Sequence, residues 1–246
     1  MPNQLPAYEA LLGSYTDDPN DAYKNTIPVA SCELKVRQMF IRKVYSLLLV
    51  QIFATVLVGS FINFNAAVKA WCVNNTWAMI IAFIGTIGFL LGAFFKSRSY
   101  PINLMFLAGF TFGEAFTLGL ACAFVKSNVV IQALLLTLVI FIGLTAFAFQ
   151  TKYDFTSYQG VLGMGLWGLI AFGFVFMFFP ARSSGVELVY SGVGALIFSA
   201  YIVVDTQLVM KKFSVEDEII ATITLYLDVI NLFLYILRFL NLRNDN

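Results

Sequence analysis

The chain has 246 residues, of which 60% are apolar and 12% are charged, with a formal net charge of +1 and no histidine. Soluble domains average about 45–50% apolar and about 25% charged residues. A soluble fold this apolar would leave too much apolar surface in water, and a near-neutral charge offers nucleic acid no basic surface. The composition also excludes intrinsic disorder for most of the chain, and it indicates a membrane protein that contacts the lipid bilayer.

The absence of histidine restricts the chemistry that is available. It removes Ser-His-Asp and Cys-His catalysis and every histidine-ligated metal site, so we expect no enzymatic activity and no resident cofactor. It also removes the usual sensor of pH between 5 and 8, so proton sensing must use carboxylates. Cys32, Cys72 and Cys122 form no CxxC pair, and we interpret them as small apolar residues.

The first 43 residues are polar and contain several prolines. They lack an early apolar core followed by a cleavage site, so they do not indicate a signal peptide. We expect a cytosolic, partly flexible N-terminal tail over 1–43 that becomes helical near Cys32. Leu5-Pro6-Ala7-Tyr8 fits an L-P-x-Y pattern that WW domains bind as polyproline II, although a chance match is the alternative.

Seven apolar stretches of about 19–23 residues follow the tail. A helix of this length crosses the roughly 30 Å of bilayer hydrocarbon, and a backbone in lipid must satisfy its own hydrogen bonds. The loops are short, so neighbouring helices are antiparallel. We predict an all-α membrane protein with a seven-transmembrane-helix bundle over 44–240 and a short C-terminal tail at 241–246. The stretches are 44–64, 77–95, 103–125, 129–149, 159–179, 188–209 and 219–237.

The distribution of basic residues predicts the orientation. Ten of the 15 Lys and Arg residues lie in the tail and the even-numbered loops, so the N-terminus should face the cytosol. Seven full crossings place the C-terminus on the other side, whereas a seventh stretch that enters and returns would leave both ends in the cytosol. Short spans fit the thinner early secretory membranes, so we expect the endoplasmic reticulum or Golgi, with the vacuole as another candidate.

Only three charged residues fall inside the apolar stretches, and they are Glu114, Asp205 and Asp228. A charge at the bilayer centre costs at least about 2.5–3.5 kcal/mol, so such residues are neutralised, paired or exposed to water. The midpoint between Asp205 and Asp228 falls at about residues 216–217, inside the polar link 211–218. An antiparallel hairpin therefore brings the two carboxyl groups to one depth.

The seventh stretch also predicts which of its sides faces other helices. Polar or small residues recur at spacings of three and four, which makes one stripe of a helix. Thr224 and Asn231 share this stripe with Asp228 and are candidates for an ion pathway. The stripe comprises Ala221, Thr224, Asp228, Asn231, Tyr235 and Arg238.

Two carboxylates in contact cannot both ionise cheaply, so Asp205 and Asp228 would share a proton and titrate near neutral pH without histidine. The protonated pair links two helices, whereas the deprotonated pair repels or takes a cation such as calcium. We predict a pH-sensing and gating pair that also contacts calcium. The alternative is a static hydrogen-bonded pair that only fixes the helix register.

Other charged residues near the predicted membrane boundary have two interpretations each. Glu114 either lines an ion cavity or is a protonated packing residue. Lys96 and Arg98 either provide the counter-charge of an ionised aspartate or extend to the boundary like ordinary basic residues. Glu216 belongs to an acidic run that either concentrates cations at a cytosolic mouth or is simply solvated.

Several motifs together resemble the Bax-inhibitor family of transmembrane proteins, in particular its Lifeguard and Golgi anti-apoptotic branch. The resemblance covers residues from about 31 to 240, and its most specific motif lies in the last apolar stretch. The motifs include Tyr100-Pro101-Ile102-Asn103-Leu104, Asp205-Thr206 and Leu225-Tyr226-Leu227-Asp228-Val229-Ile230-Asn231-Leu232-Phe233-Leu234.

The resemblance implies six helices around a central seventh, a pH-sensitive calcium leak from internal stores and suppression of cell death, with cell-death regulators as candidate partners. It matches Asp205 and Asp228 to the family's paired aspartates, and Glu187 and Glu216 to glutamates linked to ion passage. A basic latch residue falls near Lys96 and Arg98, with Ser97 as the other candidate for that position.

Two alternative functions remain at this level. The chain could be a non-conducting interaction protein that binds partners through its tail and loops. It could also be a proton-coupled cation exchanger, whose transport would saturate and follow a pH gradient.

Overall fold

A computed structural model describes residues 28–75, 77–178 and 183–245, and the tail motif at residues 5–8 lies outside these ranges. The described residues form helices and no strand, and seven helical segments are long and apolar enough to cross a membrane. The predicted all-α, seven-helix membrane fold is therefore confirmed. The long helices are α2 (Leu34–Phe64), α4 (Trp77–Phe95), α5 (Ile102–Ala123), α6 (Ser127–Gln150), α7 (Gln159–Phe178), α8 (Ser184–Lys211) and α9 (Glu218–Asp245).

Three short elements accompany the long helices. The 3-10 turn η1 (Val29–Ser31) precedes α2, the helix α3 (Ala66–Asn74) follows it, and the 3-10 turn η2 (Phe155–Tyr158) leads into α7. The segment before α2 contacts the α8–α9 turn, because Pro28 bridges Ser214 and the Val29 N–H donates to the Phe213 carbonyl at 2.9 Å.

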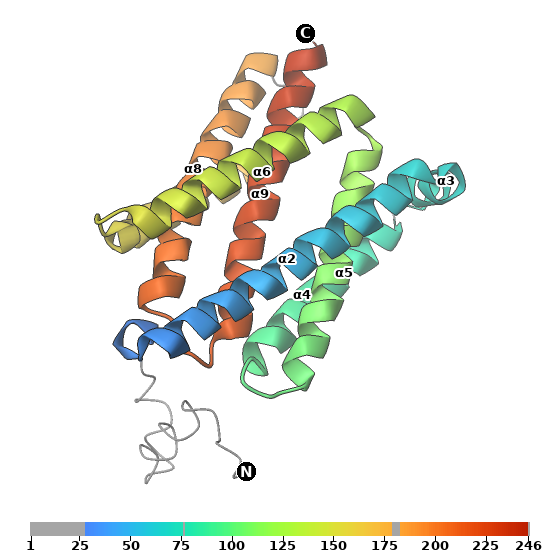
Figure 1. The fold of residues 1–246 in the computed structure, drawn as a ribbon. Helices are drawn as coiled ribbons and strands as arrows, with labels where there is room; N and C mark the ends of the chain where they lie inside the picture. Colours follow the sequence, from blue (N-terminus) through green and yellow to red (C-terminus); the bar gives the residue numbers. More distant parts are fainter. Residues whose placement is uncertain (1–27, 76, 179–182, 246) are drawn as a thin grey trace.

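The bundle has two ends that are useful to distinguish. The turn end carries η1, the α4–α5 turn, the α6–η2 loop and the α8–α9 turn, while the far end carries α3, the α5–α6 turn and the end of α9. The two ends of the described chain accordingly lie at opposite ends of the bundle (Figure 1). α9 has 28 residues, so its length of about 42 Å is sufficient for a full crossing.

The last helix is central, as predicted. α9 is the most buried span, and it packs against α8, α6 and α2 and more lightly against α4 and α5. α7 instead packs against α8 and η2, on the outside of the bundle. The other spans expose large apolar side chains, which is the expected arrangement for helices whose outer faces contact lipid.

Two helices extend beyond their predicted apolar stretches. α2 begins at Leu34, in agreement with a tail that becomes helical near Cys32, because Val36, Phe40 and Val44 are buried on one stripe while charged residues occupy the other sides. α9 continues to Asp245, so most of the predicted C-terminal tail at 241–246 is helical. Hydropathy marks the apolar core of a span, whereas these helices extend beyond it with polar turns.

Candidate functional site

The structure brings Asp205 of α8 and Asp228 of α9 together inside the bundle. Their side chains are hydrogen-bonded to each other, and each residue is only 5% exposed. Oδ2 of Asp228 is buried and has no hydrogen-bond partner among the described residues. A hydrogen bond between two carboxyl groups requires a proton, so this contact holds a pair that carries at most one negative charge.

The α8–α9 turn sets the register that produces this contact. The Lys212 N–H donates to the Leu208 carbonyl at 2.8 Å and ends α8, and the Asp217 N–H donates to the Ser214 carbonyl at 3.0 Å. The Asp217 carbonyl then accepts from the Ala221 N–H at 2.9 Å at the start of α9. A short, hydrogen-bonded turn leaves the antiparallel helices little freedom to slide, so the two aspartates stay at one depth.

Thr206 and Gln207, which directly follow Asp205, reach two further parts of the bundle. Thr206 Oγ1 lies 3.3 Å from the Tyr45 hydroxyl on α2. Gln207 is fully buried and contacts the loop between α6 and η2. Three consecutive residues of α8 therefore contact three different neighbours, which are α9, α2 and the α6–η2 loop.

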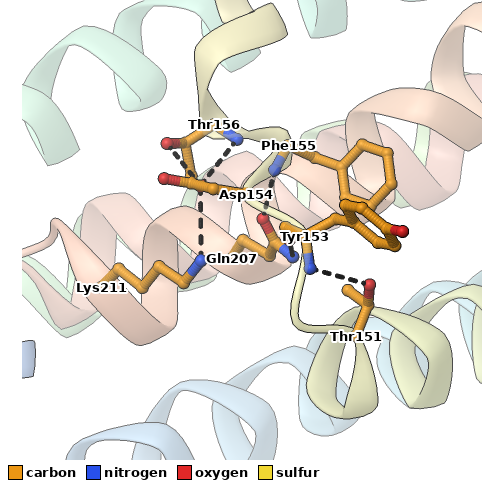
Figure 2. Close-up of polar contacts among 7 residues, drawn as sticks. All are labelled: Thr151, Tyr153, Asp154, Phe155, Thr156, Gln207 and Lys211. Atoms are coloured by element: carbon orange, nitrogen blue, oxygen red, sulfur yellow. Dashed lines mark hydrogen bonds and ion pairs between the residues drawn. The ribbon is translucent and has the colours of Figure 1, made fainter.

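The contact between Gln207 and the loop uses both ends of the side-chain amide (Figure 2). Oε1 accepts from the Phe155 N–H at 2.8 Å, and Nε2 donates to the Tyr153 carbonyl at 2.8 Å. Asp154, between these two residues, accepts from the Thr156 N–H at 3.1 Å and the Thr156 hydroxyl at 2.9 Å. The side chain of Gln207 thus fastens the loop to α8 two residues from Asp205.

Asp154 adds an ionic contact to the same loop. Lys211 Nζ lies 3.3 Å from its Oδ1, at the end of α8 (Figure 2). The hydrogen bonds from Thr156, and after them Lys211, hold the pKa of Asp154 below its ordinary value. This carboxylate is therefore ionised at neutral pH.

The structure pairs Arg98 with the α8–α9 turn. Arg98 lies 3.4 Å from Glu216 and 3.1 Å from Asp217, because the α4–α5 turn contacts the α8–α9 turn at the same end of the bundle. Lys43 of α2 is paired with Glu218 at the start of α9. Lys96 is exposed at the end of α4. The latch role of Arg98 and Lys96 stays a prediction, and Arg98 and Glu216 are partners of each other.

Among the described residues, Glu114, Thr224 and Asn231 lie in the membrane-spanning helices and make no side-chain hydrogen bond with Asp205 or Asp228. Glu114, on α5, is close enough to Tyr226 of α9 to interact with it electrostatically. The Thr224 hydroxyl donates to the Ile220 carbonyl at 2.9 Å, and the Asn231 amide donates to the Leu227 carbonyl at 2.8 Å. Both α9 side chains thus bond to their own helix.

Glu187 and Arg238 connect α8 and α9 at the far end. Their side chains are 3.4 Å apart, and the Arg238 guanidinium lies 5.4 Å from the centre of the Tyr190 ring. The Tyr190 hydroxyl is 3.3 Å from that of Tyr235. The Tyr235 ring occupies the space that a side chain at Gly194 would need, so glycine permits this close approach.

Sequence reasoning missed several polar contacts between helices. It identified Asp205 but not the roles of Thr206, Gln207 and Tyr45, although polar residues next to a buried acid were a usable signal. It also missed a buried contact between the hydroxyls of Thr55 and Tyr226 at 2.8 Å. That contact joins α2 to α9 and had no signature in the spacing of charged residues.

The acidic residues do not form a closed metal cage. Among the described residues, no group of three or more His, Cys, Asp or Glu side chains is arranged to hold a metal ion. Calcium takes about six to eight oxygen ligands, so an aspartate pair leaves most of them to water and carbonyl groups. Calcium at Asp205 and Asp228 stays a prediction.

Comparison with known proteins places the chain in a family. Residues 37–245 match the profile of the family described as "Inhibitor of apoptosis-promoting Bax1". Bax inhibitor 1 of Schizosaccharomyces pombe is 38% identical over 98% of this chain and 91% of its own length. Protein lifeguard 4 of Mus musculus is 37% identical, and the Golgi anti-apoptotic protein of Vaccinia virus strain Lister is 34% identical, each over 88% of this chain and 90% of its own length. The chain therefore belongs to the Bax-inhibitor family of integral membrane proteins.

Proposed function

We propose that this protein is a pH-sensitive calcium leak channel of an intracellular membrane, gated by Asp205 and Asp228, and that it restrains cell death by regulating stored calcium. The proposal includes no enzymatic step. The names of its relatives support the link to cell death, since these include a Bax inhibitor and a Golgi anti-apoptotic protein. We further propose residence in the endoplasmic reticulum or Golgi, with the N-terminus in the cytosol.

The contact between two carboxyl groups inside the bundle is the observation that carries the proposal. With its proton, the pair joins α8 to α9 by a hydrogen bond. Without it, two negative charges face each other at a site that is 95% buried from solvent, where repulsion is poorly screened. Loss of one proton therefore favours separation of the two helices and entry of a cation.

Neighbouring contacts offer a route by which such a separation spreads. Thr206 and Gln207 move with Asp205 because all three belong to one turn of α8. A shift of that turn strains the Tyr45 contact on α2 and the amide contacts with the α6–η2 loop. The pair of Asp205 and Asp228 is thereby coupled to the α6–η2 loop at the turn end.

The ion path in this proposal uses acidic and oxygen-bearing side chains at three levels. Glu216 marks the turn end and Glu187 the far end, while Glu114, Thr224 and Asn231 provide oxygens in between. In this structure each of the end glutamates faces an arginine, Arg98 or Arg238. A cation that passes these points must displace the arginine from the carboxylate, so both ion pairs belong to the closed state.

The decisive experiment measures calcium flux through the purified full chain in liposomes between about pH 6 and pH 8. A gate controlled by one proton changes its open fraction by at most about tenfold per pH unit. Asp205→Asn and Asp228→Asn should each flatten that response, because an amide cannot release the shared proton. Glu33→Gln is the matched control, since it changes an exposed carboxylate directly before α2 to an amide and should leave the response intact.

Other results would support a different function. Absence of flux at every pH, with cellular protection that needs the tail and tolerates both Asp→Asn changes, indicates a non-conducting interaction protein. Transport that saturates with calcium and is driven by a pH gradient indicates a proton-coupled exchanger. Wild-type gating in both Asp→Asn variants would reduce the pair to a structural contact.

A further inference from the structure

A groove of about 280 Å³ lies between α2 and α6, with α5 and α9 behind it. Its rim is formed on α6 by the side chains of Ile131, Leu134 and Leu138, which are 50%, 39% and 48% exposed. Its floor includes Val229 and Ile230 of α9, which are almost fully buried. The groove therefore opens outward to the surroundings of the bundle and reaches inward to its central helix.

Three of the polar side chains that line the groove, those of Thr55, Asn63 and Thr137, are hydrogen-bonded to the backbone. The Thr137 hydroxyl donates to the Ala133 carbonyl at 2.8 Å. The Asn63 amide donates to the carbonyls of Gly59 at 2.9 Å and Gly119 at 3.0 Å. Apolar cavities of about 150 Å³ stay dry and accept apolar guests, so a larger apolar groove has no reason to hold water.

The position of the groove within the spans identifies its surroundings. It follows α2 from Ile52 to Phe64, which corresponds to about 18 Å along the helix in the half that ends at the far end. On α6 it begins at Ser127, the first residue of the helix, directly after Lys126. The groove thus runs from the far-end membrane boundary towards the middle of the bilayer.

We propose that this groove binds one acyl chain of a phospholipid from the leaflet at the far end, with the phosphate beside Lys126 and Ser127. Hydrocarbon chains are the material that surrounds these helices, and an empty groove would lose the dispersion contacts that they provide. An elongated shape of about 18 Å fits a chain better than a rigid ring system. A basic residue at the mouth complements the charge of a phosphate.

The bound chain would rest against Val229 and Ile230, which directly follow Asp228. This regulatory consequence depends on the proposed gating function, whereas the binding itself does not. Binding can therefore be tested without any measurement of calcium flux, and a failure of one proposal leaves the other standing.

The test uses the purified full chain in phosphatidylcholine nanodiscs doped with phosphatidylcholine that carries a diazirine in the middle of one acyl chain. After illumination, mass spectrometry locates the adducts. We expect adducts concentrated on the groove segments of α2 and α6, above the level on the other lipid-facing helices. Leu134→Trp and Leu138→Trp, which fill the groove from its rim, should each lower these adducts by at least about fivefold, corresponding to about 1 kcal/mol.

Val139→Trp is the matched control, because Val139 is 67% exposed, neighbours Leu138 on α6 and does not line the groove. It should leave the adducts within about twofold of wild type. Two rim variants keep the test decisive if one of them fails to fold. Adducts spread evenly over all lipid-facing helices, equal loss in Val139→Trp, or labelling by a diazirine sterol that phosphatidylcholine does not displace would each overturn the proposal.

Discussion

The two ends of the α8–α9 hairpin are joined by opposite kinds of charged contact. Towards the turn end, Asp205 meets Asp228, which is a contact between two acids. At the far end, Glu187 meets Arg238, which is a contact between an acid and a base. The first exists only with a shared proton, and the second neutralises itself. α8 and α9 are thus joined by one contact that depends on a shared proton and one contact that does not.

The two contacts also differ in the packing that surrounds them. The far end is packed with aromatic rings, including Phe198 stacked on Tyr235 at 5.6 Å and Tyr190 edge-on to Tyr235 at 5.8 Å. The turn end is held by hydrogen bonds to Tyr45 and to the α6–η2 loop. Close ring packing resists small displacements, so a change of protonation is expected to move the turn end more than the far end.

Removal of the loop contact at the turn end should have the largest effect on stability. Gln207→Leu leaves the Phe155 N–H and the Tyr153 carbonyl without their partner, which should cost roughly 2–4 kcal/mol in the free energy of unfolding. Denaturant unfolding in mixed micelles measures this loss. Gln150→Leu, at an exposed position at the end of α6, is the control and should change stability by less than about 0.5 kcal/mol. Equal stability of the two variants would show that the amide does not hold the loop.

Removal of the far-end ion pair should have a smaller effect that does not depend on pH. Arg238→Gln loses a partly exposed ion pair and a contact with the Tyr190 ring, worth about 0.5–1.5 kcal/mol together. The loss should be the same at pH 6 and pH 8, because a contact between an acid and a base needs no shared proton. Arg243→Gln, at an exposed position on the same helix, serves as the control in parallel melting curves. A stability loss of Arg238→Gln that differs clearly between pH 6 and pH 8 would show that the far-end contact also depends on protonation.

The smallest effect is expected at Asp154. Its pKa lies below the ordinary value of 3.8 because of the Thr156 hydrogen bonds and Lys211. The ionised form therefore stabilises the loop above pH 3.8, and this contribution is lost as the pH falls through the lower pKa of the folded protein. Thermal unfolding of wild type and Asp154→Asn should differ slightly at pH 7, and this difference should shrink as the pH is lowered below 3.8. A difference that grows on acidification would reverse the assignment.

The seven spans and the shared depth of the two aspartates could be predicted from the sequence. Apolar length identifies a membrane helix, and a midpoint between Asp205 and Asp228 that falls inside a short turn places the two residues at one depth. The sequence was insufficient for Arg98, whose partners Glu216 and Asp217 lie across the bundle and depend on how two turns meet. It was also insufficient for Gln207, because a polar residue in an apolar run does not reveal which backbone groups it will bind. Contacts within one hairpin follow from spacing, whereas contacts between distant turns require the packed structure.

Asp205, Thr206 and Gln207 restrict the kind of motion that α8 can make. Successive residues point about 100° apart around a helix, so these three side chains hold the helix from three directions. A rotation of α8 about its own axis would break all three contacts at once, whereas a tilt about the aromatic far end could lengthen them together by small amounts. The contacts therefore favour a tilt of α8 about its far end, at one membrane face, over a rotation of α8 about its own axis.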